Sequence, residues 1–172
     1  GVLYLASIIR GYRQAIDRHW EHPEEFRLDP SWEEDMLRVS HRPYTQGLLF
    51  EDHRSTLEFS SSAAYLRSHT LAGLVRRLSQ EVDSDKRAVA TDPSQWITVE
   101  VRSRLVAGMS LEFLYPDGSA AHHTLKEFRN LRGESLHTAH PNDWIQLPVA
   151  FPTFPLQVIR TSTNADAANN PA

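Results

Sequence analysis

The alternation of apolar and polar residues between Trp96 and Gly118 constrains the fold of this chain more than any other feature. A period of two is the repeat of a β-strand, because successive side chains of a strand point to opposite faces. The stretch therefore predicts two strands, each with one buried and one solvated face, as in an antiparallel sheet. The side chains that we expect on the buried face are Ile97, Val99, Val101, Met109, Leu111 and Phe113.

Short segments of the same kind occur from residue 71 to residue 159, with turn residues between them. Gly108 and the run Pro116-Asp117-Gly118 provide turns around the second central strand. Gly73 lies inside a strand pattern, which is typical of a bulge or a close approach between backbones. A long polar hairpin loop is expected over residues 80–94. Together the pattern predicts six or seven strands in a small, closed antiparallel β-barrel. The expected strands are residues 71–78, 97–102, 109–114, 123–128, 135–139, 144–147 and 156–159.

The first 40 residues have the pattern of helices instead. Apolar residues at helical spacing predict an amphipathic helix of about four turns that ends before Pro23 and needs a partner for its apolar stripe. The pair Asp29-Pro30 is a helix-start signal, since Asp29 can cap free amides and Pro30 suits the first helical position. The fold class is therefore α+β, with short N-terminal helices followed by a small antiparallel β-barrel. The stripe consists of Leu5, Ile8, Ile9, Tyr12 and Ile16.

These patterns divide the chain into four parts. We expect a helical segment over residues 1–50, a linker over residues 51–70 with the boundary near Ser60, a barrel over residues 71–160, and a disordered tail over residues 161–172, which is poor in apolar residues. Because Gly1 lies beside an apolar helical pattern, we expect the chain to be a segment of a longer protein.

Composition excludes several kinds of chemistry. The chain has no cysteine, which excludes disulfides, thiolate nucleophiles and cysteine-bound metal clusters within it. A net charge of −4 argues against binding nucleic acid through overall charge, although a local basic face is compatible with it.

No apolar run is long enough for a membrane span, and no signal peptide is evident. No glycine-rich phosphate loop and no G-x-S-x-G motif occur. Because these motifs are missing, we expect no catalytic or cofactor-binding residue in this chain. We also expect no metal-binding residue, because the nearest histidine cluster lacks a metal-ligand spacing. That cluster is His122, His123, His137 and His140.

Two places in the sequence could carry a function. Arg102 and Arg104 alternate with apolar residues, so we expect both on the exposed face of one strand, where they could hold phosphates. The alternative is an ordinary solvated face that Glu100 and Glu112 partly neutralise. Residues 40–47, S-H-R-P-Y-T-Q-G, predict a loop of fixed shape that presents Arg42 and Tyr44. The alternative there is structural, with Tyr44 packed under the loop and Arg42 capping the preceding helix.

Four stretches in the same order resemble the C-terminal part of the collagenase-like peptidases, peptidase family U32, and within it the branch of prephenate-dependent tRNA uridine hydroxylases (TrhP or YegQ). The likeness runs from about Tyr4 to Arg160. The stretches are Y-L-A-S-I-I-R-G-Y-R-Q-A-I-D, S-H-R-P-Y-T-Q-G, V-E-V-R-S-R-L-V-A-G-M-S-L-E-F-L-Y-P-D-G and P-N-D-W-I-Q-L-P.

This resemblance implies that residues 1–50 end a TIM-like catalytic domain and that the barrel is similar to the second domain of translation elongation factors. It implies a cytoplasmic protein whose catalytic domain, with cysteines that hold an iron–sulfur cluster in related hydroxylases, lies upstream of this chain. The implied role of this chain is to help position tRNA, with Arg42, Tyr44, Arg102, Arg104 and Arg132 as candidate contacts. Two alternatives stay open: a structural or protein-interaction barrel that supports the catalytic domain, and peptidase activity in the chain itself, which we favour least.

Overall fold

The structure is a computed structural model that describes residues 1–41, 66–76 and 95–163. It begins with the helix α1 (Val2–Glu21), the short 3-10 helix η1 (Pro23–Glu25) and the helix α2 (Pro30–Leu37). Pro23 ends α1 because proline cannot donate a backbone hydrogen bond. The Asp29 carboxylate accepts a hydrogen bond of 2.9 Å from the Ser31 amide, and the hydrogen bonds from Ser31 lower the pKa of Asp29. Both predicted helix signals are therefore confirmed. None of the helices in these residues has an apolar run long enough to cross a bilayer.

The rest of the described chain consists of strands joined by turns. All pairings between them are antiparallel, in an eight-stranded sheet of order β5-β4-β10-β1-β2-β9-β6-β7 and a two-stranded sheet of β3 and β8. The strands are β1 (His69–Arg76), β2 (Gln95–Val101), β3 (Leu105–Val106), β4 (Ser110–Leu114), β5 (Ala120–Thr124), β6 (Phe128–Asn130), β7 (Ser135–Leu136), β8 (Thr138–Ala139), β9 (Trp144–Val149) and β10 (Val158–Ser162).

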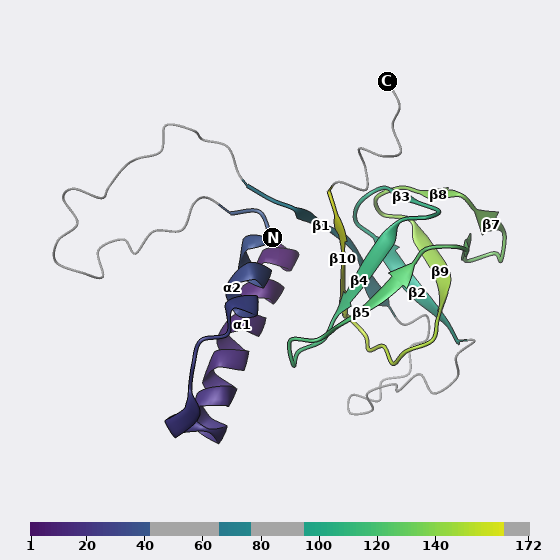
Figure 1. Cartoon of the computed structure of the whole chain (residues 1–172). Coiled ribbons are helices and arrows are strands. Elements are labelled where there is room, and N and C mark those ends of the chain that lie inside the picture. The colour runs from purple at the N-terminus through teal and green to yellow at the C-terminus, as the bar shows by residue number, and fades with distance from the viewer. Residues whose placement is uncertain (42–65, 77–94, 164–172) are drawn as a thin grey trace.

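The large sheet curves around one apolar core to form a half-barrel, and the two helices lie together beside it (Figure 1). All six side chains predicted to be buried in the central stretch belong to this core. Burial of such side chains is the dominant favourable contribution to folding. The predicted α+β fold with a barrel-like sheet is therefore confirmed. The two central strands, however, are not neighbours: β2 pairs with β1 and β9, whereas β4 pairs with β5 and β10.

Gly73 has the role that its place in the strand pattern predicted. The register between β1 and β10 shifts between Leu71 and Gly73, which marks a bulge or irregularity. A Cβ atom at Gly73 would lie 2.7 Å from Cγ1 of Val99 and 2.8 Å from the carbonyl oxygen of Glu100. Only glycine therefore allows β1 and β2 to approach as closely as they do.

Three expected segments were wrong, and the ends of the other expected strands differ from the structure by up to three residues. Residues 123–128 do not form one strand, because β5 ends at Thr124 and β6 begins at Phe128. Residues 135–139 form the two short strands β7 and β8, which belong to different sheets. The expected tail from residue 161 begins too early, since β10 continues to Ser162 and Thr161 is buried. The Thr161 hydroxyl donates a 2.8 Å hydrogen bond to the Ser110 carbonyl, which ties this residue to the barrel. The expected hairpin loop and most of the expected linker lie outside the described residues.

The helices pack on the barrel through a small apolar cluster and a group of charged residues. The cluster joins Leu3 and Val39 of the helical segment to Leu114 of β4, with Leu71, Ala120 and Val158 packed around them. On α1 the buried residues are Leu3, Ser7, Arg10 and Gly11, so the helix does not use its predicted apolar stripe for this contact. Four residues of that stripe are exposed, namely Leu5, Ile9, Tyr12 and Ile16. The packing of this stripe on a partner therefore stays a prediction.

Candidate nucleic-acid interface

Four neighbouring strands bring polar side chains from distant parts of the sequence into one row. Arg76 of β1 lies opposite Thr98 of β2, Thr98 lies opposite Gln146 of β9, and Gln146 lies opposite Arg129 of β6. Directly paired residues share a face of the sheet. Because the neighbouring positions in these strands belong to the core, the row lies on the outer face of the barrel. We call the outer side of β1, β2, β9 and β6 the four-strand face.

An arginine is stacked on a tryptophan at one side of this face. The guanidinium carbon of Arg129 lies 3.8 Å from the ring centroid of Trp96, and Nε of Arg129 donates a 3.0 Å hydrogen bond to Oε1 of Gln146. The stacking is a cation–π contact, and the hydrogen bond fixes the plane of the guanidinium group. The face thus combines a preorganised cation with an aromatic surface.

Glu100 joins two further arginines on the same face. Oε2 of Glu100 accepts a 2.7 Å hydrogen bond from Nε of Arg76, and Oε1 lies 2.8 Å from Nη2 of Arg102. Trp144 of β9 is the direct neighbour of Glu100 in the sheet and is 39% exposed. Arginines near exposed tryptophans are the combination that holds phosphates and stacks bases in proteins that bind single-stranded nucleic acid.

The structure places the predicted contact residues differently from the expectation. Arg102 and Arg104 are both exposed, but they do not lie on one strand, because β2 ends at Val101. The amides of Arg102 and Ser103 both donate to the Ala72 carbonyl at the bulge of β1, and the regular ladder of β2 stops there. Arg104 therefore lies between β2 and β3. Arg132 is exposed in the turn between β6 and β7, outside the four-strand row.

The other predicted contacts have mixed outcomes. Arg42 and Tyr44 lie outside the described residues. The alternative in which acidic residues neutralise the arginines is right for Glu100, which pairs with Arg102. It is wrong for Glu112, whose partners are His69, Arg160 and Arg38.

Sequence reasoning missed most of the four-strand face. The signal that could have found part of it was the alternation itself, since Trp96 and Trp144 occupy the positions opposite to the buried ones. Nothing in the sequence shows that β2 and β9 are neighbours, although that pairing places Trp144 beside Glu100. The missed residues are Arg76, Trp96, Arg129, Trp144 and Gln146.

A second charged group lies between the helices and the barrel. The Asp35 carboxylate of α2 receives Nη1 of Arg10 at 2.9 Å and Nη1 of Arg160 at 2.5 Å, and Nε of Arg160 donates a 2.7 Å hydrogen bond to Glu112 of β4. Arg10 also donates to the carbonyl oxygens of Gly118 and Ser119 in the turn between β4 and β5. Arg160 is 1% exposed and Arg10 is 7% exposed. We call Arg10, Asp35, Glu112 and Arg160 the interface network.

The interface network changes the acidity of Glu112. The imidazole of His69 and then the guanidinium of Arg160 lower the pKa of Glu112 to about 2, against the opposing effect of burial. The Arg160 contact is the shorter one, whereas Nε2 of His69 lies 3.6 Å away and is an ion-pair partner only when protonated. Burial lowers the pKa of Arg10, and the Asp35 carboxylate opposes that effect. The network therefore joins two α-helices and two strands through opposite charges at a nearly dry contact.

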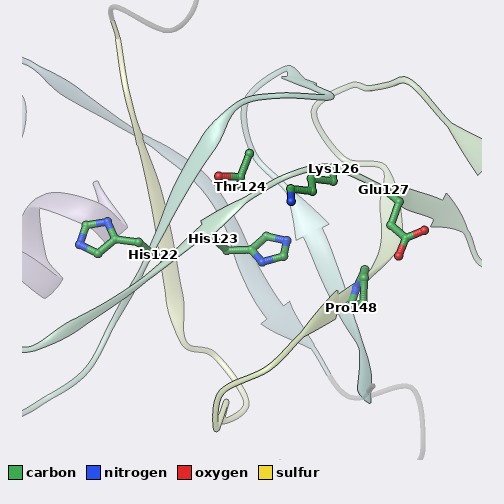
Figure 2. Close-up of a pocket in the computed structure, with 6 residues that line it drawn as sticks. All are labelled: His122, His123, Thr124, Lys126, Glu127 and Pro148. Atoms are coloured by element: carbon green, nitrogen blue, oxygen red, sulfur yellow. The ribbon is translucent and has the colours of Figure 1, made fainter. Parts of the chain in front are cut away.

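A small hollow of about 340 Å³ occurs beside β5 (Figure 2). His123 points into it toward Lys126, Glu127 and Pro148, whereas the neighbouring His122 points the other way. The His123 ring meets the rings of Phe113 and Phe151 edge-on, and its Nε2 atom has no hydrogen-bond partner in the described structure. Burial and then Lys126 lower the pKa of His123, which favours its neutral form. Within residues 1–41, 66–76 and 95–163, no three histidine or acidic side chains are grouped to hold a metal ion.

The iron–sulfur cluster implied by the resemblance does not fit this chain. Such clusters are held by cysteine thiolates, and the sequence contains no cysteine.

Comparison with known proteins gives two matches to models of one family. Residues 1–58 match peptidase family U32, and residues 81–160 match the peptidase family U32 C-terminal domain. No curated protein matches the chain at a significant level.

Two solved structures were also found. One is the C-terminal domain of a Geobacillus thermoleovorans protein assigned as a U32 peptidase, with 25% identity, a TM-score of 0.42, and coverage of 53% of this chain and 90% of that chain. The other is its selenomethionine variant, with 24% identity, a TM-score of 0.42, and coverage of 54% and 99%.

The two family matches occur in the order that the sequence motifs predicted, and together they leave out only residues 59–80 and those after 160. The chain belongs to peptidase family U32, and its second half is that family's C-terminal domain.

Proposed function

We propose that this chain is a non-catalytic region that helps to position RNA for a catalytic domain elsewhere in the same protein. We further propose that this protein is a cytoplasmic tRNA uridine hydroxylase of the TrhP or YegQ branch, which forms 5-hydroxyuridine with the help of an iron–sulfur cluster outside this chain. The partners would then be the catalytic domain and tRNA.

The four-strand face is the observation that carries the RNA proposal. Arg129 is stacked on Trp96, and Arg76 and Arg102 are paired with Glu100, whose direct neighbour in the sheet is Trp144. Phosphate contacts fix the position of a nucleic acid, and stacking on aromatic rings holds single-stranded bases without demanding a particular sequence. Because the chain as a whole has a charge of −4, binding would depend on this local arrangement.

Fluorescence anisotropy with labelled tRNA at two salt concentrations tests this proposal. We expect binding at low salt that weakens as salt rises, because released counterions drive phosphate binding. Separate Arg102→Ala and Arg129→Ala variants, each of which removes one arginine of the four-strand face, should bind more weakly, with the slope of log K against log salt reduced by about 0.7 to 0.9 for each lost phosphate contact. Arg27→Ala, an exposed change in the helical segment, serves as the matched control. Absence of binding at low salt, or an equal loss in the control, would contradict the proposal.

The interface network favours a second function, in which the barrel supports the helices of the family's preceding domain. Arg10 and Asp35 belong to the helical segment, whereas Glu112 and Arg160 belong to the barrel, so their contacts fix one part on the other. A purely structural barrel predicts no RNA binding. It also predicts that variants of the network, such as Glu112→Gln, lower the free energy of unfolding of the whole chain in urea denaturation.

A further inference from the structure

Two cations on the four-strand face share a single carboxylate. Glu100 holds Arg76 through one oxygen and Arg102 through the other, while its own side chain is 12% exposed. The side chains of Arg76 and Arg102 are 28% and 38% exposed, so both can be reached from solvent. The Glu100 carboxylate thus lies between two guanidinium groups. An external anion that binds both arginines would have to take the same position.

We propose that Arg76 and Arg102 form a site for one backbone phosphate of single-stranded RNA, that Glu100 holds this site closed in the free protein, and that the adjoining base stacks on Trp144. The proposal rests on the proposed RNA-positioning function and adds its contact site and its internal competitor. Carboxylate and phosphate oxygens both match the planar fork of donors in arginine, so one can replace the other between the two side chains.

The position of Trp144 makes RNA a better match than an acidic peptide. Trp144 lies directly opposite Glu100 in the β2–β9 pair, and such side chains have Cβ atoms about 4.5 to 5.5 Å apart. A phosphate between the arginines and a base on Trp144 therefore fit within the reach of one nucleotide. A peptide carboxylate would use the arginines but would have no need of the exposed indole.

The two possible roles of Glu100 predict different effects of its substitution on RNA binding. If Glu100 only supported the fold, its loss would leave RNA binding unchanged or weaker. If it competes with phosphate, Glu100→Gln releases both arginines and removes a repulsive charge from the site. Because exposed ion pairs are weak, we expect RNA binding to tighten about two- to fivefold at low salt. The salt dependence should become steeper, since more charge is available to the phosphate.

The test uses the chain of residues 1–172 and a fluorescein-labelled ten-nucleotide oligouridylate, with a duplex RNA of equal length and an acidic ten-residue peptide as comparison probes. Glu24→Gln, an exposed change in η1, is the control for net charge. Trp144→Ala should weaken oligouridylate binding at least about fivefold, and Trp144→Phe should retain most of it, because stacking needs only an aromatic ring. Circular dichroism and thermal unfolding of each variant establish that the fold is unchanged.

Each outcome decides one question. Tighter binding of the oligouridylate by Glu100→Gln but not by Glu24→Gln, together with weaker binding by Trp144→Ala, supports the site. Wild-type binding that Glu100→Gln leaves unchanged or weakens overturns the inference but leaves the proposed function standing. Binding of the acidic peptide or the duplex as tightly as the oligouridylate also overturns it. Absence of tRNA and oligouridylate binding by the wild type and by all variants overturns the proposed function itself.

Discussion

Replacing Glu112 by glutamine tests whether the interface network stabilises the contact between the helices and the barrel. The substitution keeps the shape of the side chain and removes the charge that faces Arg160 and His69. The pKa of Glu112 falls from an ordinary 4.5 to about 2 in the folded chain. Each unit of pKa difference between the folded and unfolded chain is equivalent to about 1.4 kcal/mol, so this difference corresponds to about 3 kcal/mol in the free energy of unfolding at neutral pH. The side chain is 16% exposed, so solvent screens this contribution only in part.

The sign of the pH dependence follows from the direction of the pKa. A carboxylate whose pKa is lowered by folding stabilises the fold above its unfolded pKa, and the stabilisation is lost as pH falls toward the folded pKa. The wild type should therefore exceed Glu112→Gln in free energy of unfolding by about 3 kcal/mol at pH 7, and the difference should shrink between pH 4.5 and about 2.

Urea denaturation followed by tryptophan fluorescence and circular dichroism at pH 7, 5, 4 and 3 measures the difference. Glu127→Gln, an exposed change beside β6, is the matched control and should alter stability little at any of these pH values. A difference for Glu112→Gln below about 0.5 kcal/mol at pH 7, or one that stays the same at pH 3, would refute the reasoning.

Two further substitutions test the packing of the barrel. Gly73→Ala should lower the free energy of unfolding by about 1 to 3 kcal/mol, because its Cβ would overlap Val99 and the Glu100 carbonyl. Urea denaturation measures this effect, and equal stability of the variant would show that β1 and β2 can separate. Thr161→Val keeps the shape of a fully buried residue but removes the hydrogen bond to the Ser110 carbonyl, so thermal unfolding should reveal a loss of about 1 to 2 kcal/mol. An unchanged melting temperature for Thr161→Val would mean that the end of β10 contributes nothing to the barrel.

The sequence by itself determined the local elements of this protein. The period-two pattern around Val99 and Leu111 identified the core face of the sheet, and Asp29-Pro30 identified the start of α2, because these signals depend only on neighbours in the chain. Gly73 could be recognised as a close approach for the same reason. The order of four motifs was sufficient for the family, since the matches to peptidase family U32 depend on sequence alone.

Only the tertiary structure decided which of these elements are neighbours. Arg10, Asp35 and Arg160 are far apart in the chain and meet because α1 and α2 pack beside β10, and no local pattern records that contact. The pairing of β2 with β9 likewise places Trp144 beside Glu100. Strand pairing and helix docking depend on burial of the whole core and on the pairing of charged side chains across its surface. The candidate site could therefore be recognised only in the folded structure.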